Sequence, residues 1–170
     1  MVHSIELVFD GDTEASIRRI WAELAAAGVP SQAPAARPHV TLVVAERIDP
    51  RVDAVLCSVA DRLPLSCTLG ATLIFGHSHG VLARLVVPTV VLLTLHEQVY
   101  RLSAPHLTPG PLPNATPGAW TPHVTLARRV GPDQLARAQR IAGGSAVAGR
   151  FVGLRRWDGG ARTEHPIVGG

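Results

Sequence analysis

The pentapeptide Pro38-His39-Val40-Thr41-Leu42 returns unchanged as Pro122-His123-Val124-Thr125-Leu126, 84 residues further along the chain. Residues i and i+2 of a β-strand point to the same face, so each copy presents an imidazole and a hydroxyl side by side. Two such pairs facing each other would form a site with one acid, one base and two hydrogen-bond donors. The repeat therefore predicts two similar halves whose histidines converge.

Each copy is expected to form a strand that a short turn and a helix follow. Residues 105–118 contain five prolines and two glycines and are expected to form a long irregular loop, and the glycine-rich tail after residue 157 is expected to fray. The expected strands are 4–9, 39–45, 65–75, 81–87, 120–130 and 146–157, and the expected helices are 14–27, 50–63, 89–102 and 132–141.

This order of elements predicts an α+β fold. We expect a bilobed molecule, with two pseudo-symmetric lobes of antiparallel sheet, helices packed outside and an active-site cleft between the lobes. The chain of 170 residues fits a single domain made of these two lobes.

Composition limits the classes of function. The chain is 46% hydrophobic and 17% charged, so it is able to bury a core, and its net charge of +3 permits an anionic ligand without indicating a long nucleic-acid groove. All 16 basic residues are arginine; a GC-rich genome is the favoured explanation, and the ability of arginine to bind phosphate in bidentate fashion is the alternative. Only 4% of the residues are aromatic, which favours a nucleotide or a short oligonucleotide over long RNA.

Location and metal binding are also constrained. Cys57 and Cys67 match no zinc pattern and form no disulfide framework. No signal peptide is evident at the N-terminus, and Arg84 and Pro88 interrupt the most apolar stretch. We therefore expect a cytoplasmic protein that does not associate with a membrane. The His77-Ser78-His79 tripeptide is interpreted as a hairpin connector, since no acidic residue or cysteine nearby completes a metal site.

The two His-x-Thr pairs match the needs of phosphodiester cleavage. A base removes a proton from the attacking oxygen and an acid protonates the leaving oxygen, and histidine serves in either role near neutral pH. The two groups must lie on opposite sides of the phosphorus, which two facing strands would provide. Threonine hydroxyls would donate hydrogen bonds to the non-bridging oxygens. This chemistry requires no metal or other cofactor.

On these residues the chain resembles the 2H phosphoesterase superfamily, in particular its bacterial 2′-5′ RNA ligase-like branch. That superfamily has two His-x-Ser/Thr motifs about half a chain apart, and its bilobed α+β fold matches the order of elements expected here. The resemblance implies metal-independent action on 2′,3′-cyclic or 2′-5′-linked phosphates. It implies that His39 and His123 are the catalytic acid and base, in that order for ring opening, and that Thr41 and Thr125 bind the phosphate.

Three further residues are candidates for the site. Relatives often carry a basic residue shortly after the second motif, and Arg128 or Arg129 fills that position; strict alternation places Arg129 on the face of His123, and a β-bulge would place Arg128 there instead. Phe9 is a candidate for lining the cleft, with core packing as the alternative.

The expected function is a monomeric phosphodiesterase that opens 2′,3′-cyclic phosphates of nucleotides or short RNA ends to 2′-phosphates. Two alternatives remain open: 2′-5′ RNA ligation at the same site, and a non-catalytic domain that binds nucleotides or RNA ends through the same four residues.

Overall fold

The structure is a computed structural model that describes residues 2–33, 35–76 and 79–169. Short 3₁₀ segments at Cys57–Arg62 and Ala104–His106 supplement the helices and strands. The helices are α1 (Gly11–Ala26), α2 (Val52–Leu56), α3 (Val90–Ser103) and α4 (Pro132–Ala142). The strands are β1 (His3–Phe9), β2 (His39–Ile48), β3 (Leu65–Phe75), β4 (Gly80–Val86), β5 (Leu107–Pro111), β6 (His123–Val130), β7 (Val147–Asp158) and β8 (Thr163–Val168).

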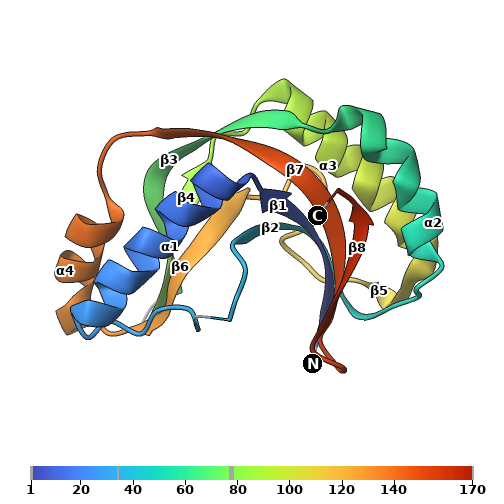
Figure 1. Cartoon of the computed structure of the whole chain (residues 1–170). Coiled ribbons are helices and arrows are strands. Elements are labelled where there is room, and N and C mark those ends of the chain that lie inside the picture. Colours follow the sequence, from blue (N-terminus) through green and yellow to red (C-terminus); the bar gives the residue numbers. More distant parts are fainter. Residues whose placement is uncertain (1, 34, 77–78, 170) are drawn as a thin grey trace.

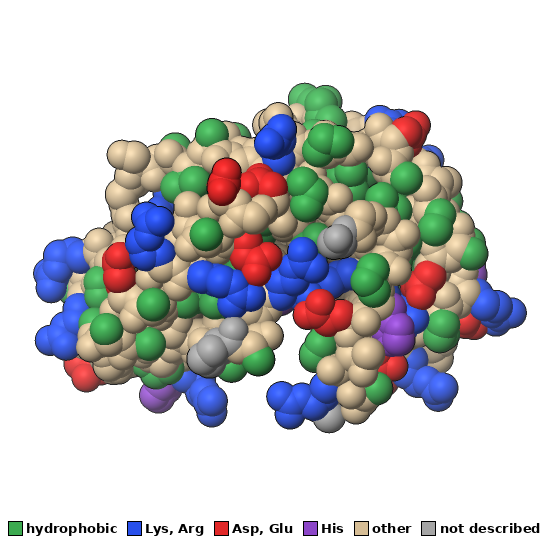
Figure 2. Space-filling view, viewed as in Figure 1, with side chains coloured by type: hydrophobic (Ala, Val, Ile, Leu, Met, Phe, Trp, Pro, Cys, Tyr) green, Lys and Arg blue, Asp and Glu red, His purple; other side chains and the backbone are tan. Residues whose placement is uncertain are grey.

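The strands form one antiparallel sheet in the order β5-β2-β1-β7-β3-β4-β6, with β8 paired to β7 beside this path. One edge of β7 pairs with β3 through residues 147–151 and with β8 through residues 154–158, while β1 occupies the other edge. The sheet curves into an arch (Figure 1), and a hollow with arginine and acidic side chains around it opens beneath (Figure 2). The expected α+β class and antiparallel sheet are confirmed, and the two lobes are arms of one continuous sheet.

The helices cross over between the two arms. Helix α1 follows β1 but packs against α4, β6 and β7, whereas α3 follows β4 but packs against α2 and β2 (Figure 1). The contact faces are apolar at helical spacing, with Ile17, Trp21 and Leu24 buried on α1. Each of these side chains contributes roughly 1.5–3 kcal/mol through burial. Each arm is therefore covered by a helix that follows a strand of the other arm, so helix packing as well as the sheet joins the arms.

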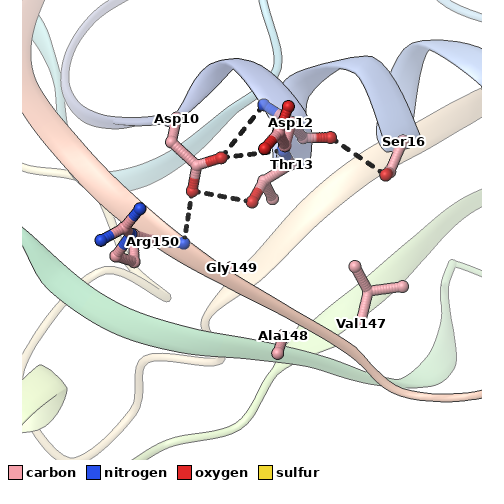
Figure 3. Close-up of a pocket in the computed structure, with 8 residues that line it drawn as sticks. All are labelled: Asp10, Asp12, Thr13, Ser16, Val147, Ala148, Gly149 and Arg150. Atoms are coloured by element: carbon pink, nitrogen blue, oxygen red, sulfur yellow. Dashed lines mark hydrogen bonds between the residues drawn. The ribbon is translucent and has the colours of Figure 1, made fainter.

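Helix α1 begins at Gly11, three residues earlier than expected. The Asp10 carboxylate accepts hydrogen bonds from the backbone N–H groups of Asp12 and Thr13 and from the Thr13 hydroxyl (Figure 3). Its second oxygen also accepts from the backbone N–H of Arg150 at 2.7 Å, which ties the start of α1 to β7. The carboxylate satisfies N–H groups that have no partner within the helix, so it fixes where the helix begins.

Two strands were not expected. β5 lies in the proline-rich segment assigned to an irregular loop, and β8 lies in the tail expected to fray. Each pairs with a single neighbour, β5 with β2 and β8 with β7. Edge strands tolerate Pro109, Pro111 and Pro166 because only one side of such a strand donates to a ladder. The expectation of a loop and of a frayed tail was wrong for this reason.

Smaller differences concern the second helix and the connector. The expected helix 50–63 is α2 followed by a 3₁₀ segment. The connector between β3 and β4 includes residues 77–78, which lie outside the described residues. In the described part of the chain, none of the helices combines the length and the apolar character that crossing a membrane requires.

Candidate active site

The two motifs lie on β2 and β6, toward opposite ends of the sheet order, and both strands have the same irregularity. Val43 of β2 pairs with Ile5 of β1 and Thr41 pairs with Glu6, so Leu42 is an extra residue that forms a β-bulge. In the second motif, Ala127 pairs with Leu82 and Thr125 pairs with Ala83, so Leu126 is the corresponding bulge. Strands β2 and β6 contact each other although no ladder joins them. The repeated sequence therefore gives a repeated local structure, and the fold brings the two copies together.

Both histidine rings are held in the same way. The Nδ1 atom of His39 lies 2.8 Å from the carbonyl oxygen of Arg37, and Nδ1 of His123 lies 2.7 Å from the carbonyl oxygen of Thr121. In each case the acceptor is two residues before the histidine, across the motif's proline. A carbonyl accepts only, so Nδ1 carries the hydrogen and Nε2 is left to exchange a proton.

A cavity of about 410 Å³ lies against the first motif. Its wall includes His39, Thr41 and Arg128, and a small adjoining cavity of about 20 Å³ is lined by His39, Thr125 and Arg128. His39 and Arg128 thus border both spaces, and the two threonines approach them from different strands. The larger cavity also has apolar walls from Val2, Val44 and Trp157 and charged walls from Glu6, Arg37, Arg155 and Glu164.

The structure distinguishes between the two candidate arginines. The bulge at Leu126 shifts the alternation of β6 by one residue, which brings Arg128 back to the face of Thr125. Arg129 has a φ of 58°, is exposed and lines neither cavity. The bulge alternative is therefore the one that the fold adopts.

The second histidine is electrostatically coupled to the first. Burial lowers the pKa of the His123 imidazole below its ordinary value; the hydrogen bond to the Thr121 carbonyl opposes this, and the positive charges of Arg128 and His39 lower the pKa further. The ring also packs against Phe75, with 4.7 Å between ring centroids. His123 is therefore biased toward the neutral form, with Nε2 available to accept a proton.

Two tryptophans brace the motifs by donating hydrogen bonds to the threonine carbonyls. The Trp21 indole on α1 donates to the carbonyl oxygen of Thr125 at 3.2 Å, and the Trp120 indole donates to the carbonyl oxygen of Thr41 at 2.9 Å. Trp120 also stacks on the buried His96 ring, at 3.9 Å between centroids. Trp120 therefore packs against His96 and links the approach to the second motif with the strand of the first motif.

The site contains charged residues that sequence reasoning missed. Glu6 and Arg155 are 3% and 4% exposed and line the larger cavity beside His39. The only signal for Glu6 was a carboxylate within the otherwise apolar run of β1.

Phe9, the candidate for lining the cleft, is buried in the core instead and packs on Phe151 with 4.9 Å between ring centroids.

A third cavity, of about 350 Å³, lies between α1 and β7, where Asp10, Asp12, Thr13 and Arg150 contribute to its wall (Figure 3). The hydrogen bonds of Asp10 there cap α1 and fasten it to β7. This cavity therefore belongs to the scaffold. Across residues 2–33, 35–76 and 79–169, no three His, Cys, Asp or Glu side chains are grouped so that they could bind a metal ion.

Comparisons with known proteins agree with the observed fold. The family model of the 2′-5′ RNA ligase superfamily matches residues 10–152. The fold is similar to E. coli LigT in apo form (14% identity, TM-score 0.58, covering 98% of this chain and 94% of that chain). It is also similar to TT0787 of Thermus thermophilus (17%, 0.58, 99% and 99%) and to Kluyveromyces marxianus Usb1 with uridine monophosphate (11%, 0.55, 98% and 98%). No curated protein matches the chain.

Proposed function

Because the chain belongs to the 2′-5′ RNA ligase superfamily, we propose that it is a phosphodiesterase that opens 2′,3′-cyclic phosphates of nucleotides or short RNA ends and leaves a 2′-phosphate. The observation that carries this proposal is that the same type of hydrogen bond orients both imidazoles. Each donates from Nδ1 to a backbone carbonyl, which leaves two Nε2 atoms, from opposite halves of the chain, for proton transfer.

The reaction needs one proton transfer on each side of the phosphorus. Nε2 of His123 takes a proton from water as the water oxygen forms its bond to phosphorus. Nε2 of His39 gives a proton to the 3′-oxygen as the bond from that oxygen to phosphorus breaks. The two events are roughly in line, so the acid and the base must come from different strands. This mechanism moves protons only and requires no cofactor.

The assignment of the base rests on the lowered pKa of His123, since a base must be unprotonated at the start. Thr41 and Thr125 would donate their hydroxyl hydrogens to the non-bridging oxygens, where charge builds up as the ring opens. Arg128 would pair with the same charge, because it lies beside both His39 and Thr125.

The dimensions of the site favour a nucleotide-sized substrate. The cavity of about 410 Å³ combines arginines with apolar walls, a mixture that suits a phosphate joined to a nucleoside. Structures of the same fold, E. coli LigT with 3′-AMP and with ATP, hold nucleotides. These comparisons support a mononucleotide or a short RNA end as the ligand.

The test is turnover of 2′,3′-cyclic nucleotides in the presence of EDTA. Wild-type protein is expected to produce the 2′-phosphate, and His39→Ala and His123→Ala are each expected to lose roughly 10²–10⁴ in kcat/KM. His106→Ala, a histidine outside both repeated motifs, serves as the matched control. Turnover that EDTA abolishes, or that survives in the His39→Ala/His123→Ala double variant, would contradict the proposal.

The same experiment separates the alternatives. Activity confined to oligonucleotides with 2′,3′-cyclic and 5′-hydroxyl ends would point to ligation at this site. Binding of nucleotides without turnover would point to a recognition domain.

A further inference from the structure

The two matching motifs have different residues across the sheet. Thr41 of the first motif pairs with Glu6 on β1, and Thr125 of the second motif pairs with Ala83 on β4. Glu6 and Ala83 therefore occupy equivalent positions in the two halves. A carboxylate stands beside the first histidine where the second half has only a methyl group.

The Glu6 carboxylate is buried and fully engaged. Its Oε1 accepts a hydrogen bond of 2.6 Å from the Ser4 hydroxyl, and its Oε2 accepts a bond of 2.8 Å from Nε of Arg155. The same guanidinium reaches Glu164 on β8. A buried carboxylate is expensive to keep ionised unless it is paired and hydrogen-bonded, and Glu6 has both kinds of partner.

His39 lies between two acceptors. Its Nδ1 lies 2.8 Å from the Arg37 carbonyl oxygen, and its Nε2 lies 3.5 Å from Oε1 of Glu6. The 3.5 Å between Nε2 and Oε1 is an ion-pair distance rather than a hydrogen bond, so the Glu6 charge attracts a protonated ring without taking up its Nε2 hydrogen. His123 has the equivalent carbonyl contact, and Ala83 offers no acceptor on its other side.

Other charged groups face His39 from the neighbouring elements. A terminal nitrogen of Arg155 on β7 lies 3.3 Å from Nδ1, and Arg128 on β6 and Arg37 before β2 line the same cavity. His123 is coupled to the ring from β6, and Glu164 on β8 lies behind Arg155. The three arginines all oppose a positive ring. Within the described residues, Glu6 is the carboxylate that lies within ion-pair distance of His39.

We propose that Glu6 is the positioning residue that gives the two matching motifs opposite roles: it ion-pairs with the protonated ring of His39, so that His39 begins each reaction as the acid. This inference rests on the proposed function. When the ring opens, the Nε2 proton of His39 passes to the leaving 3′-oxygen while the water proton passes to His123, and Glu6 neither gains nor loses a proton. After product release, Glu6 favours return of a proton from solvent to His39.

The test compares Glu6→Gln, Glu6→Asp and Asp53→Asn. Glutamine keeps the size of the side chain and removes its charge, and aspartate keeps the charge on a shorter arm. Asp53→Asn removes a carboxylate that pairs with Arg156 through two contacts of 2.8 Å, away from the cavity, and is the matched control for the loss of a carboxylate–arginine pair. Circular dichroism melts establish that each variant is folded.

In the proposed mechanism, activity requires His39 to be protonated. Weaker ion pairing between Glu6 and His39 therefore moves the alkaline limb of the pH profile of kcat/KM to lower pH. We expect this shift in Glu6→Gln, together with a loss of roughly tenfold in kcat/KM at neutral pH, because the protonated ring loses its ion-pair partner. Glu6→Asp is expected to retain part of the alkaline limb, and Asp53→Asn all of it. Nitrogen NMR of the His39 ring, identified by its loss in His39→Ala, is expected to show a smaller protonated fraction in Glu6→Gln.

The outcomes separate this inference from the function on which it rests. Turnover with an unchanged alkaline limb and unchanged His39 signals in Glu6→Gln would overturn the role of Glu6 and leave the phosphodiesterase in place. A wild-type protein that turns over no cyclic phosphate would overturn the proposed function and, with it, the acid role assigned here.

Discussion

Strand β2 carries His39 beside the carboxylate of Glu6, whereas β6 carries His123 within electrostatic reach of the guanidinium of Arg128. The position in the first half that corresponds to Arg128 is Val44, which lines the cavity without a charge. The two identical pentapeptides therefore have different charged neighbours: the anionic Glu6 beside the first histidine and the cationic Arg128 near the second. The comparison teaches that a repeated backbone supplies two imidazoles with equivalent hydrogen bonds and that the charges beside them differ; in the proposed mechanism, this difference sets the direction of proton transfer.

What the halves share is backbone geometry. Each motif has a bulge after its threonine, a histidine bonded to a carbonyl two residues earlier, and an indole donor on the threonine carbonyl. These features keep the two threonine hydroxyls and the two rings in equivalent places. The predictions below test where this equivalence ends.

The largest expected difference concerns the leaving group. His39→Ala is expected to lower kcat/KM by roughly 10²–10⁴ on a 2′,3′-cyclic nucleotide and by much less on a nucleoside nitrophenyl phosphodiester, because nitrophenolate leaves without a proton. His123→Ala removes the base and is expected to impair both substrates. The measurement is the ratio of kcat/KM for the two substrates in each variant. Equal ratios in the two variants would remove the distinction between acid and base.

The two threonines test the phosphate contacts that both motifs are proposed to make. Thr41→Val and Thr125→Val are each expected to lower kcat/KM by roughly 10- to 100-fold, since each deletes one hydrogen bond to a charged oxygen. Thr72→Val on β3, a half-buried threonine outside both cavities, is the control. Losses that differ by more than tenfold between the two motifs would show that the halves do not hold the phosphate equally.

Arg128 tests the cation of the second half. Its charge is one cause of the lowered pKa of His123, so Arg128→Ala lets that pKa rise toward the ordinary value. A base must be unprotonated, so the acidic limb of the kcat/KM profile is expected to move to higher pH, with the largest loss of activity below neutrality. Arg129→Ala, which changes an exposed neighbour, is the control and leaves the limb in place. The measurement is a pH–rate profile of both variants.

The smallest effects are expected for the tryptophan braces. Trp21→Phe and Trp120→Phe each remove one indole donor and leave a threonine carbonyl without it, which costs about 1–2 kcal/mol of the free energy of unfolding. Urea denaturation measures both, with Trp157→Phe in the cavity wall as the control. A lower free energy of unfolding in only one of the two variants would mean that the indole hydrogen bond stabilises only one of the halves.

Much of the site follows from the repeat itself. The pentapeptide predicted two strands and their meeting; His39, Thr41 and Thr125 line the cavities, whereas His123 lies outside both cavity walls and packs against Phe75. The bulges at Leu42 and Leu126 did not follow, because leucine fits a regular strand as well as a bulge, and the choice between Arg128 and Arg129 depended on them. Glu6 was visible only as a charge within an apolar strand, and its partner Arg155 comes from the other end of the chain.

The edge strands were missed for a related reason. Proline counts against a strand in local sequence patterns, yet β5 and β8 each need only one hydrogen-bonded side. Tertiary pairing, which a local pattern does not contain, therefore decided those segments.

The crossed helices have a consequence for how such a protein is divided or duplicated. A fragment that ends with β3 would carry the first motif but would lack α3, which covers β2, and its own α1 would lack β6 to cover. Two identical fragments could each pack a helix on the other's sheet, so that the uncovered face of each sheet is covered by a helix of its partner.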